Sequence, residues 1–211
     1  MKIAVVCANG KEGRLVVKEA LGRGHDVTAV VRGENRSSAP KAVIRDIMDV
    51  TADDLAGFDV VVDAFGAWAS EALPLHTASL MHLCDALSGT QTHLIVVGGA
   101  GSLYVDPEHT VQLVDTPEFP DEYRPLANAQ REELAALRGR DDVRWTFVSP
   151  AADFRPDGPR TGSYVLAGEE LTFGADGASA VSYADYAVAV VDEAERTSDA
   201  HVRERVSVRW A

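Results

Sequence analysis

Short, uninterrupted apolar runs alternate with longer amphipathic segments along this chain, and that alternation limits the possible folds more than any other feature. The spacing of apolar residues predicts helices at Arg14–Arg23, Leu73–Leu87 and Asn128–Arg138. Continuous apolar strands joined through helices form a parallel sheet covered on both faces, with right-handed crossovers. The sequence therefore predicts a doubly wound α/β fold, with strands at Lys2–Val6, Val27–Val31, Ala42–Ile47, Asp59–Ala64, His93–Val97 and Trp145–Ser149.

Two long segments interrupt this rhythm. A chain of 211 residues can bury one substantial core, so we expect a single domain over residues 1–211. Residues 100–126 contain several prolines, and residues 150–177 are rich in Gly and Pro, with strand-like pieces at Tyr164–Leu166 and Leu171–Phe173. Both segments follow the carboxyl ends of strands, where open α/β sheets bind ligands. We expect them to form the substrate side of a cleft; plain surface loops are the alternative. A helix at Tyr183–Arg196 and a strand at Val202–Trp210 complete the prediction.

The charge balance excludes several classes of partner. The chain has 20 Lys and Arg against 33 Asp and Glu, a formal net charge of −13. Such a surface repels the phosphates of nucleic acids and of anionic lipids. No apolar run approaches the roughly 20 residues that span a bilayer. Cys7 and Cys84 lack metal-site spacing, so we expect no metal site. With only two cysteines, a disulfide scaffold is excluded and a cytoplasmic location is expected. We expect either a monomer or a homodimer.

The turn after the first strand has the composition of a phosphate-binding loop. Residues 7–13 read Cys-Ala-Asn-Gly-Lys-Glu-Gly and lie between a predicted strand and a predicted helix. Gly10 lets backbone N–H groups approach a pyrophosphate, and Gly13 allows the helix to pack closely on the strand. The helix N-terminus adds unpaired donors and a positive dipole end. The turn predicts a bound dinucleotide; a tight turn without a ligand is the alternative.

Arg32 favours NADP(H) over NAD(H) as that dinucleotide. It follows the second strand about 20 residues beyond the glycine turn, where a carboxylate would bind the ribose of NAD(H) and an arginine would accept the 2′-phosphate of NADP(H). Arg36 lies nearby, whereas Glu34 opposes the assignment. A solvated strand end is the alternative for Arg32, and NAD(H) stays possible.

Several motifs together resemble one known family. The turn just described is followed by Asp63-Ala64-Phe65-Gly66, by Val97-Gly98-Gly99-Ala100-Gly101, by Trp145 to Ala152, and by Tyr183-Ala184-Asp185-Tyr186. The whole chain resembles the atypical short-chain dehydrogenase/reductase proteins of the NADH-flavin-reductase-like group, close to the NmrA-like and biliverdin-reductase-B-like groups. The usual Gly-Ala-Thr-Gly of that group is Cys7-Ala8-Asn9-Gly10 here, and a side chain on Cys7 is expected to crowd the turn.

The resemblance implies a Rossmann-type sheet of order 3-2-1-4-5-6 and a set of cofactor contacts. Asp46 and Ile47 would lie beside the adenine, and Ser149 to Ala152 along the nicotinamide. The implied contact residues are Cys7, Asn9, Gly10, Lys11, Glu12, Gly13, Arg32, Asp46, Ile47, Ala64, Phe65, Gly66, Val97, Gly98, Gly99, Ser149, Pro150, Ala151 and Ala152.

The sequence does not contain the catalytic pair of ordinary short-chain dehydrogenases. No tyrosine is followed four residues later by lysine. Direct hydride transfer to a flavin- or quinone-like acceptor needs only stacked rings and a positioning hydrogen bond. We expect Phe65, Trp68, Phe154 and Tyr123 to supply aromatic faces, and Ser102, Tyr104 and Tyr123 are the catalytic candidates.

Two functions follow from these features, and a third, a sugar- or polyketide-modifying epimerase or dehydratase relative, is disfavoured because such relatives generally keep the Tyr/Lys pair. The first is an NADPH-dependent reductase of a flavin- or quinone-like acceptor, and the second is a non-catalytic, NmrA-type dinucleotide sensor. His76 and His109 are possible acids near neutral pH, although solvated surface histidines are the expectation for both.

Overall fold

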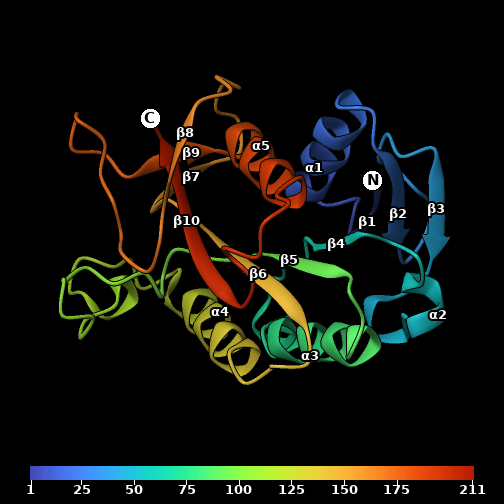
Figure 1. The fold of residues 1–211 in the computed structure, drawn as a ribbon. Helices are drawn as coiled ribbons and strands as arrows, with labels where there is room; N and C mark the ends of the chain where they lie inside the picture. The colour runs from blue at the N-terminus through green and yellow to red at the C-terminus, as the bar shows by residue number, and fades with distance from the viewer.

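The computed structural model describes all 211 residues and contains an eight-stranded sheet and a two-stranded one (Figure 1). The large sheet has the order β3-β2-β1-β4-β5-β6-β10-β8, and only β8 runs antiparallel to its neighbour. Its strands are β1 (Lys2–Val6), β2 (Asp26–Val31), β3 (Lys41–Ile44), β4 (Val60–Asp63), β5 (His93–Val97), β6 (Arg144–Pro150), β8 (Tyr164–Ala167) and β10 (Glu204–Trp210). The small sheet pairs β7 (Asp153–Arg155) with β9 (Ala180–Ser182) in parallel.

Helices cover both faces of the large sheet. Figure 1 shows α1 (Lys11–Gly22) and α5 (Tyr183–Ala194) on one face and α3 (Leu75–Leu87) and α4 (Arg124–Leu137) on the other. The one-turn α2 (Ala52–Leu55) begins with a capping box formed by Thr51 and Asp54. Short 3-10 helices lie at Ile47–Asp49, Ser70–Ala72 and Leu113–Asp115. The Rossmann-type order 3-2-1-4-5-6 is therefore confirmed.

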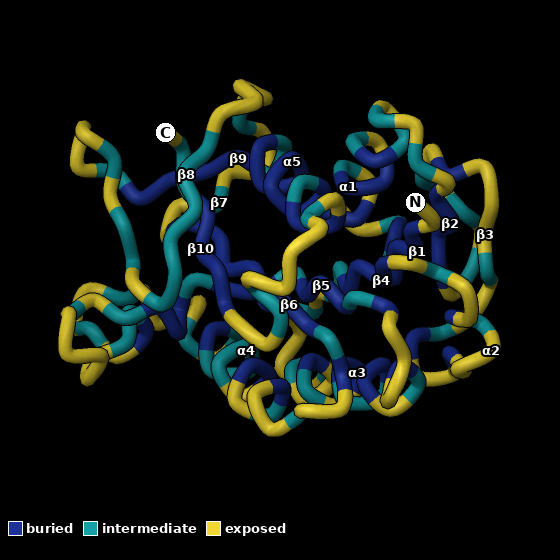
Figure 2. Tube along the Cα trace, in the orientation of Figure 1, coloured by how far each residue is buried: buried dark blue, intermediate teal, exposed yellow.

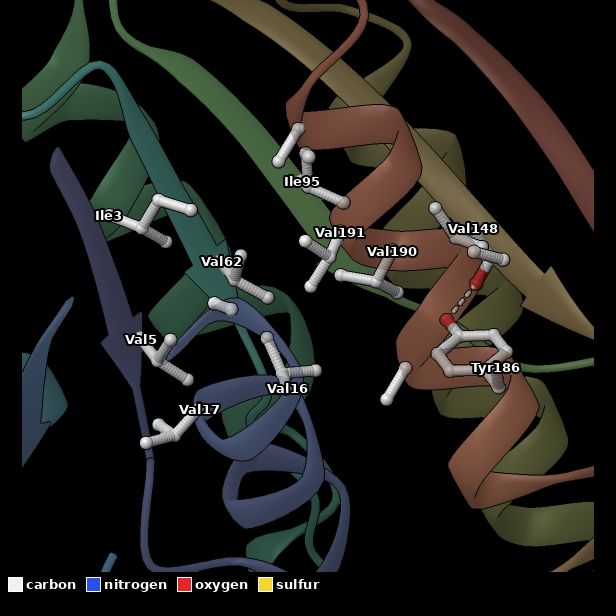
Figure 3. Packing of buried hydrophobic residues seen from close by; sticks show 14 of the residues in the cluster. Ile3, Val5, Val16, Val17, Val62, Ile95, Val148, Tyr186, Val190 and Val191 are labelled. Carbon is white, nitrogen blue, oxygen red and sulfur yellow. Dashed lines mark hydrogen bonds between the residues drawn. The ribbon is translucent and has the colours of Figure 1, made fainter. Parts of the chain in front are cut away.

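Each face of the sheet has its own apolar core, and buried residues concentrate along the central strands (Figure 2). Figure 3 shows β-branched side chains of β1 and β4 meeting those of α1 and α5. Each fully buried valine or isoleucine contributes roughly 1.5–3 kcal/mol of transfer free energy. Tyr186 is fully buried there because its hydroxyl donates to the Val148 carbonyl at 2.6 Å.

Three local predictions differ from the structure. The strand expected at Ala42–Ile47 ends at Ile44, because the Asp46 carboxylate accepts from the Met48 amide and starts a 3-10 turn. Leu171–Phe173 forms no strand; Leu171 donates to the Tyr104 carbonyl, and Phe173 is more than half exposed. The strands β7 and β9 were not predicted, because three residues are too few to show a periodic pattern.

No helix combines the length and the apolar character that a bilayer-spanning segment requires.

Candidate functional site

The carboxyl ends of β1, β4, β5 and β6 lie side by side at one edge of the sheet. Val6 is in register with Asp63, and Asp63 is in register with Val96. Val97 is in register with Val148. Because the strands are parallel, the segments that follow them emerge at this same edge. The structure therefore brings together residues 7–13, 64–66, 97–99 and 149–152.

The first turn of α1 leaves backbone donors free at this edge. The helix begins at Lys11, and its N-cap is Gly10, which has no side chain to accept from the first amides. The Arg14 amide, which donates to the Gly10 carbonyl, is the first intrahelical donor, so the amides of Lys11 to Gly13 have no acceptor within the helix. A Cβ on Gly13 would lie 2.7 Å from the Cys7 carbonyl oxygen. The turn thus requires glycine for close packing and presents N–H groups suited to an anion.

Cys7 occupies a backbone conformation that favours glycine. Its φ is 58°, in the left-handed region, which residues other than glycine rarely adopt. The side chain is half-buried and packs against the apolar core under β1, so it does not close the turn. Burial, reinforced by the charge of Asp63, raises the pKa of the thiol to about 12, so the sulfur is protonated and unreactive.

Asn9 ties the turn to the loop that follows β2. Its amide nitrogen donates to the Glu34 carbonyl at 2.8 Å, and its amide oxygen accepts from the Arg36 backbone N–H at 2.6 Å. Both polar ends of the side chain are therefore engaged by the protein. Asn9 fixes the position of residues 34–36 relative to the glycine turn.

Arg32 and Arg36 are exposed on that loop, and neither guanidinium has a hydrogen-bond or ion-pair partner within the chain. Other arginines, such as Arg23, Arg138 and Arg205, form ion pairs. In a protein with a net charge of −13, two unpaired cations on the loop that Asn9 links to the glycine turn are suited to an anion.

Glu12 and Lys11 are neighbours in the same turn but differ in solvent exposure. Lys11 is exposed, whereas Glu12 is 7% exposed, and neither of its carboxyl oxygens has a hydrogen-bond partner. Burial raises the pKa of Glu12 well above its usual range, so the carboxyl is neutral. Only the backbone of Glu12 is available to a phosphate. Sequence reasoning placed Glu12 in the turn but did not reveal this buried acid.

Asp46 and Ile47 lie just beyond the end of β3, the strand that pairs with β2 in the sheet. The Asp46 carboxylate caps the 3-10 turn at Met48, and Ile47 is buried among the core residues under β1 and β4. Their predicted place beside an adenine stays a prediction.

The segments after β4, β5 and β6 form the other half of the edge. Ala64 and Phe65 are half-buried and Gly66 is exposed, while Gly98 and Gly99 are buried. A Cβ on Gly98 would lie 2.0 Å from the Phe147 ring. Val97 is half-buried; Ser149, Pro150 and Ala151 are buried; and Ala152 is exposed.

Comparison with known proteins agrees with this geometry. A family model described as NAD(P)H-binding matches residues 7–194. This chain belongs to the NAD(P)H-binding family. A crystal structure of a Streptococcus pneumoniae protein described as a "putative NADH-flavin reductase" has 52% identity and a TM-score of 0.97, with complete coverage of both chains. A Lactobacillus casei structure has 32% identity and a TM-score of 0.88 over both full chains.

A Bacillus subtilis protein, the uncharacterized YwnB, is 46% identical over 211 residues, which are 99% of this chain and 98% of that protein. The resemblance to the NADH-flavin-reductase-like group of atypical short-chain dehydrogenase/reductase proteins is thereby confirmed. The residue-level cofactor contacts of this NAD(P)H-binding protein stay predictions.

The three catalytic candidates lie in different surroundings. Ser102 is buried, and its hydroxyl accepts from the buried Arg205 guanidinium at 2.9 Å. Tyr104 is half-buried and stacks on the His109 ring, with centroids 4.6 Å apart. Tyr123 is 47% exposed and meets Trp68 edge-on at 6.2 Å. Of the three, only Tyr123 is exposed.

The four expected platform aromatics fall into separate groups. Trp68, which follows the 64–66 segment, is 68% exposed beside Tyr123. Phe154 instead packs on Tyr183 at 4.0 Å, and Phe65 packs edge-on against His76 at 5.2 Å.

The expectation of a solvated His76 is wrong. His76 is 1% exposed on α3, with its Nδ1 3.7 Å from a carboxyl oxygen of Glu133 on α4. Asp63, at the end of β4, is also buried. Burial raises the pKa of Asp63 to about 6 and that of Glu133 to about 7. Burial alone would lower the pKa of His76, but Glu133, the Ala67 backbone and Asp63 together hold that pKa above its usual value. His109 is exposed, as expected, and pairs with Glu170.

Proposed function

We propose that this protein is an NADPH-dependent reductase of a flavin- or quinone-like acceptor, with NADH as a weaker cofactor. The observation that carries the cofactor preference is the exposed, unpaired Arg32 and Arg36, on a loop that Asn9 ties to the glycine turn through the backbone of residues 34 and 36. The turn would hold the pyrophosphate through backbone amides, and the guanidiniums would hold the 2′-phosphate. The printed name of the Streptococcus relative supports a flavin-type acceptor.

The chemical demands on the protein are small. When bound, the reduced nicotinamide supplies the hydride. The segments at 64–66, 97–99 and 149–152 would orient the nicotinamide end, and the exposed Trp68 and Tyr123 would present aromatic faces to a flat acceptor. The proton that completes the reduction would come from water, since Ser102 is buried and its hydroxyl faces the Arg205 guanidinium.

Substitution of Arg32 tests the cofactor assignment. Arg32→Ala should weaken NADPH binding about ten- to hundredfold and leave NADH binding nearly unchanged, because a charge-assisted hydrogen bond is worth roughly 1.5–3 kcal/mol. Lys18→Ala removes an exposed cation from α1, away from the proposed phosphate contacts, and is the matched control. Calorimetric titration of both variants measures the effect. Equal losses for the two cofactors in Arg32→Ala would contradict the assignment.

A second function rests on a specific observation. None of the buried groups that could donate a proton has an open route to an acceptor, since each is more than nine-tenths buried: Glu12, Asp63, His76 and Glu133. That arrangement favours an NmrA-type sensor that binds the dinucleotide without turnover. NADPH oxidation with riboflavin, FMN and a benzoquinone separates the two functions: turnover above buffer supports the reductase, and tight binding without turnover supports the sensor.

A further inference from the structure

Three buried ionisable groups lie beneath the segment that follows β4. Asp63, His76 and Glu133 come from β4, α3 and α4, and each is 3% exposed or less. One carboxyl oxygen of Asp63 and one of Glu133 have no hydrogen-bond partner. Neither acid pairs with lysine or arginine; the cation available to them is His76. The thiols of Cys7 and Cys84 also sense the charge of Asp63.

This cluster holds residues 64–67 by three separate contacts. The Asp63 carboxylate accepts from the Phe65 amide at 3.0 Å. The Phe65 ring packs edge-on against the His76 imidazole. His76 Nε2 lies 3.3 Å from the Ala67 nitrogen and 3.2 Å from the Ala67 oxygen. Residues 64–67, which would line the nicotinamide side, are thus held in place by contacts with ionisable groups.

The position of His76 Nε2 gives its protonation state a structural consequence. A neutral imidazole with its proton on Nδ1 can accept from the Ala67 N–H, whereas an imidazolium can only donate, and its acceptor is the Ala67 carbonyl. Glu133 faces Nδ1 and stabilises the imidazolium. Gain or loss of one proton therefore exchanges the hydrogen bond that fixes Ala67.

We propose that His76, held by Glu133, is a positioning residue that sets the conformation of residues 64–67 and the local charge beneath the dinucleotide. The inference rests on the proposed function for its effect on cofactor binding. As pH rises, the cluster passes from net positive to net negative charge. An anionic cofactor is then bound less tightly, because like charges oppose it across a poorly solvated protein interior.

The affinity for NADPH between pH 6 and 8.5 tests the charge effect. The dissociation constant of the wild-type protein should rise about tenfold, and Glu133→Gln, which keeps a hydrogen-bonding group but loses the charge, should reduce that rise to about threefold or less. Glu193→Gln is the matched control, because Glu193 is 3% exposed and pairs with His201 at 2.8 Å near α5's carboxyl end. It should keep the wild-type profile.

Amide hydrogen exchange tests, without any cofactor, whether His76 holds residues 64–67 in place. At pH 7, residues 64–68 should exchange at least about fivefold faster in His76→Gln than in the wild-type protein, whereas β10 should be unchanged. If the wild-type protein binds no NADPH, the proposed function fails and the exchange result alone decides the inference. Wild-type exchange in His76→Gln, or a wild-type pH profile in Glu133→Gln, would overturn it.

Discussion

The two halves of the ligand edge differ in how they use their polar groups. On the side of the glycine turn, the first amides of α1 and the guanidiniums of Arg32 and Arg36 have no partners within the chain. On the side of residues 100–123 and 150–178, many polar groups bond within the chain, although the Nε of the buried Arg205 has no partner. Asp106 accepts from Thr110 and Val111, and Arg205 donates to Ser102 and Glu169. The first half is suited to an external anion, and the second is suited to holding its own shape.

The largest expected effect is a loss of stability in the half formed by residues 100–123 and 150–178. Arg205→Met removes the cation that bonds Ser102 and Glu169, and leaves the buried Ser102 hydroxyl without its donor. The free energy of unfolding should fall by about 3 kcal/mol. Denaturant unfolding measures the loss. Arg138→Met, at the more exposed arginine on the same Glu169, is the control and should cost less than about 1 kcal/mol. If folded Arg205→Met binds NADPH as tightly as the wild type, the division between a cofactor-binding half and a structural half is supported. A selective loss of NADPH affinity would contradict that division.

An intermediate effect comes from the one polar group of the glycine turn that is buried. The raised pKa of Glu12 means that the folded state holds its proton more tightly than the unfolded state. The stability from that proton is complete below the unfolded pKa, near 4.3, and declines as pH rises toward the folded pKa. Glu12→Gln should therefore gain stability relative to the wild type by up to about 2 kcal/mol between pH 5 and 6.5, from a limiting slope of about 1.4 kcal/mol per pH unit below the folded pKa.

Unfolding measured at pH 5, 6.5 and 8 without cofactor checks this prediction. Glu122→Gln, at an exposed glutamate, is the control and should show no pH-dependent difference. A constant difference between Glu12→Gln and the wild type across that range would show that Glu12 titrates normally.

The smallest expected effect concerns the acceptor. Trp68 is 68% exposed and contacts Tyr123, so its removal should cost little stability. Trp68→Ala should raise the KM for FMN or a quinone about fivefold, equivalent to about 1 kcal/mol of lost stacking, while the dissociation constant of NADPH stays the same. Phe173→Ala, at another exposed aromatic, is the matched control. An unchanged KM would exclude Trp68 as the acceptor platform.

The sequence was informative wherever the signal is local. Continuous apolar strands predict the doubly wound sheet, the family resemblance implies its strand order, and the glycine turn predicts the place of residues 7–13. The burial of His76 was not predictable, because Glu133 lies on a different helix. The bracing of Arg36 by Asn9 likewise joins two loops that only the folded sheet brings together. Contacts between distant segments, rather than patterns within one, decide what these side chains do.

Phosphorus NMR of bound NADP⁺ tests the central claim most directly. If the guanidiniums of Arg32 and Arg36 hold the 2′-phosphate, its pKa in the complex should fall clearly below the free value of about 6, and Arg32→Ala should restore most of the difference. A bound 2′-phosphate that titrates as it does in free solution would contradict the claim.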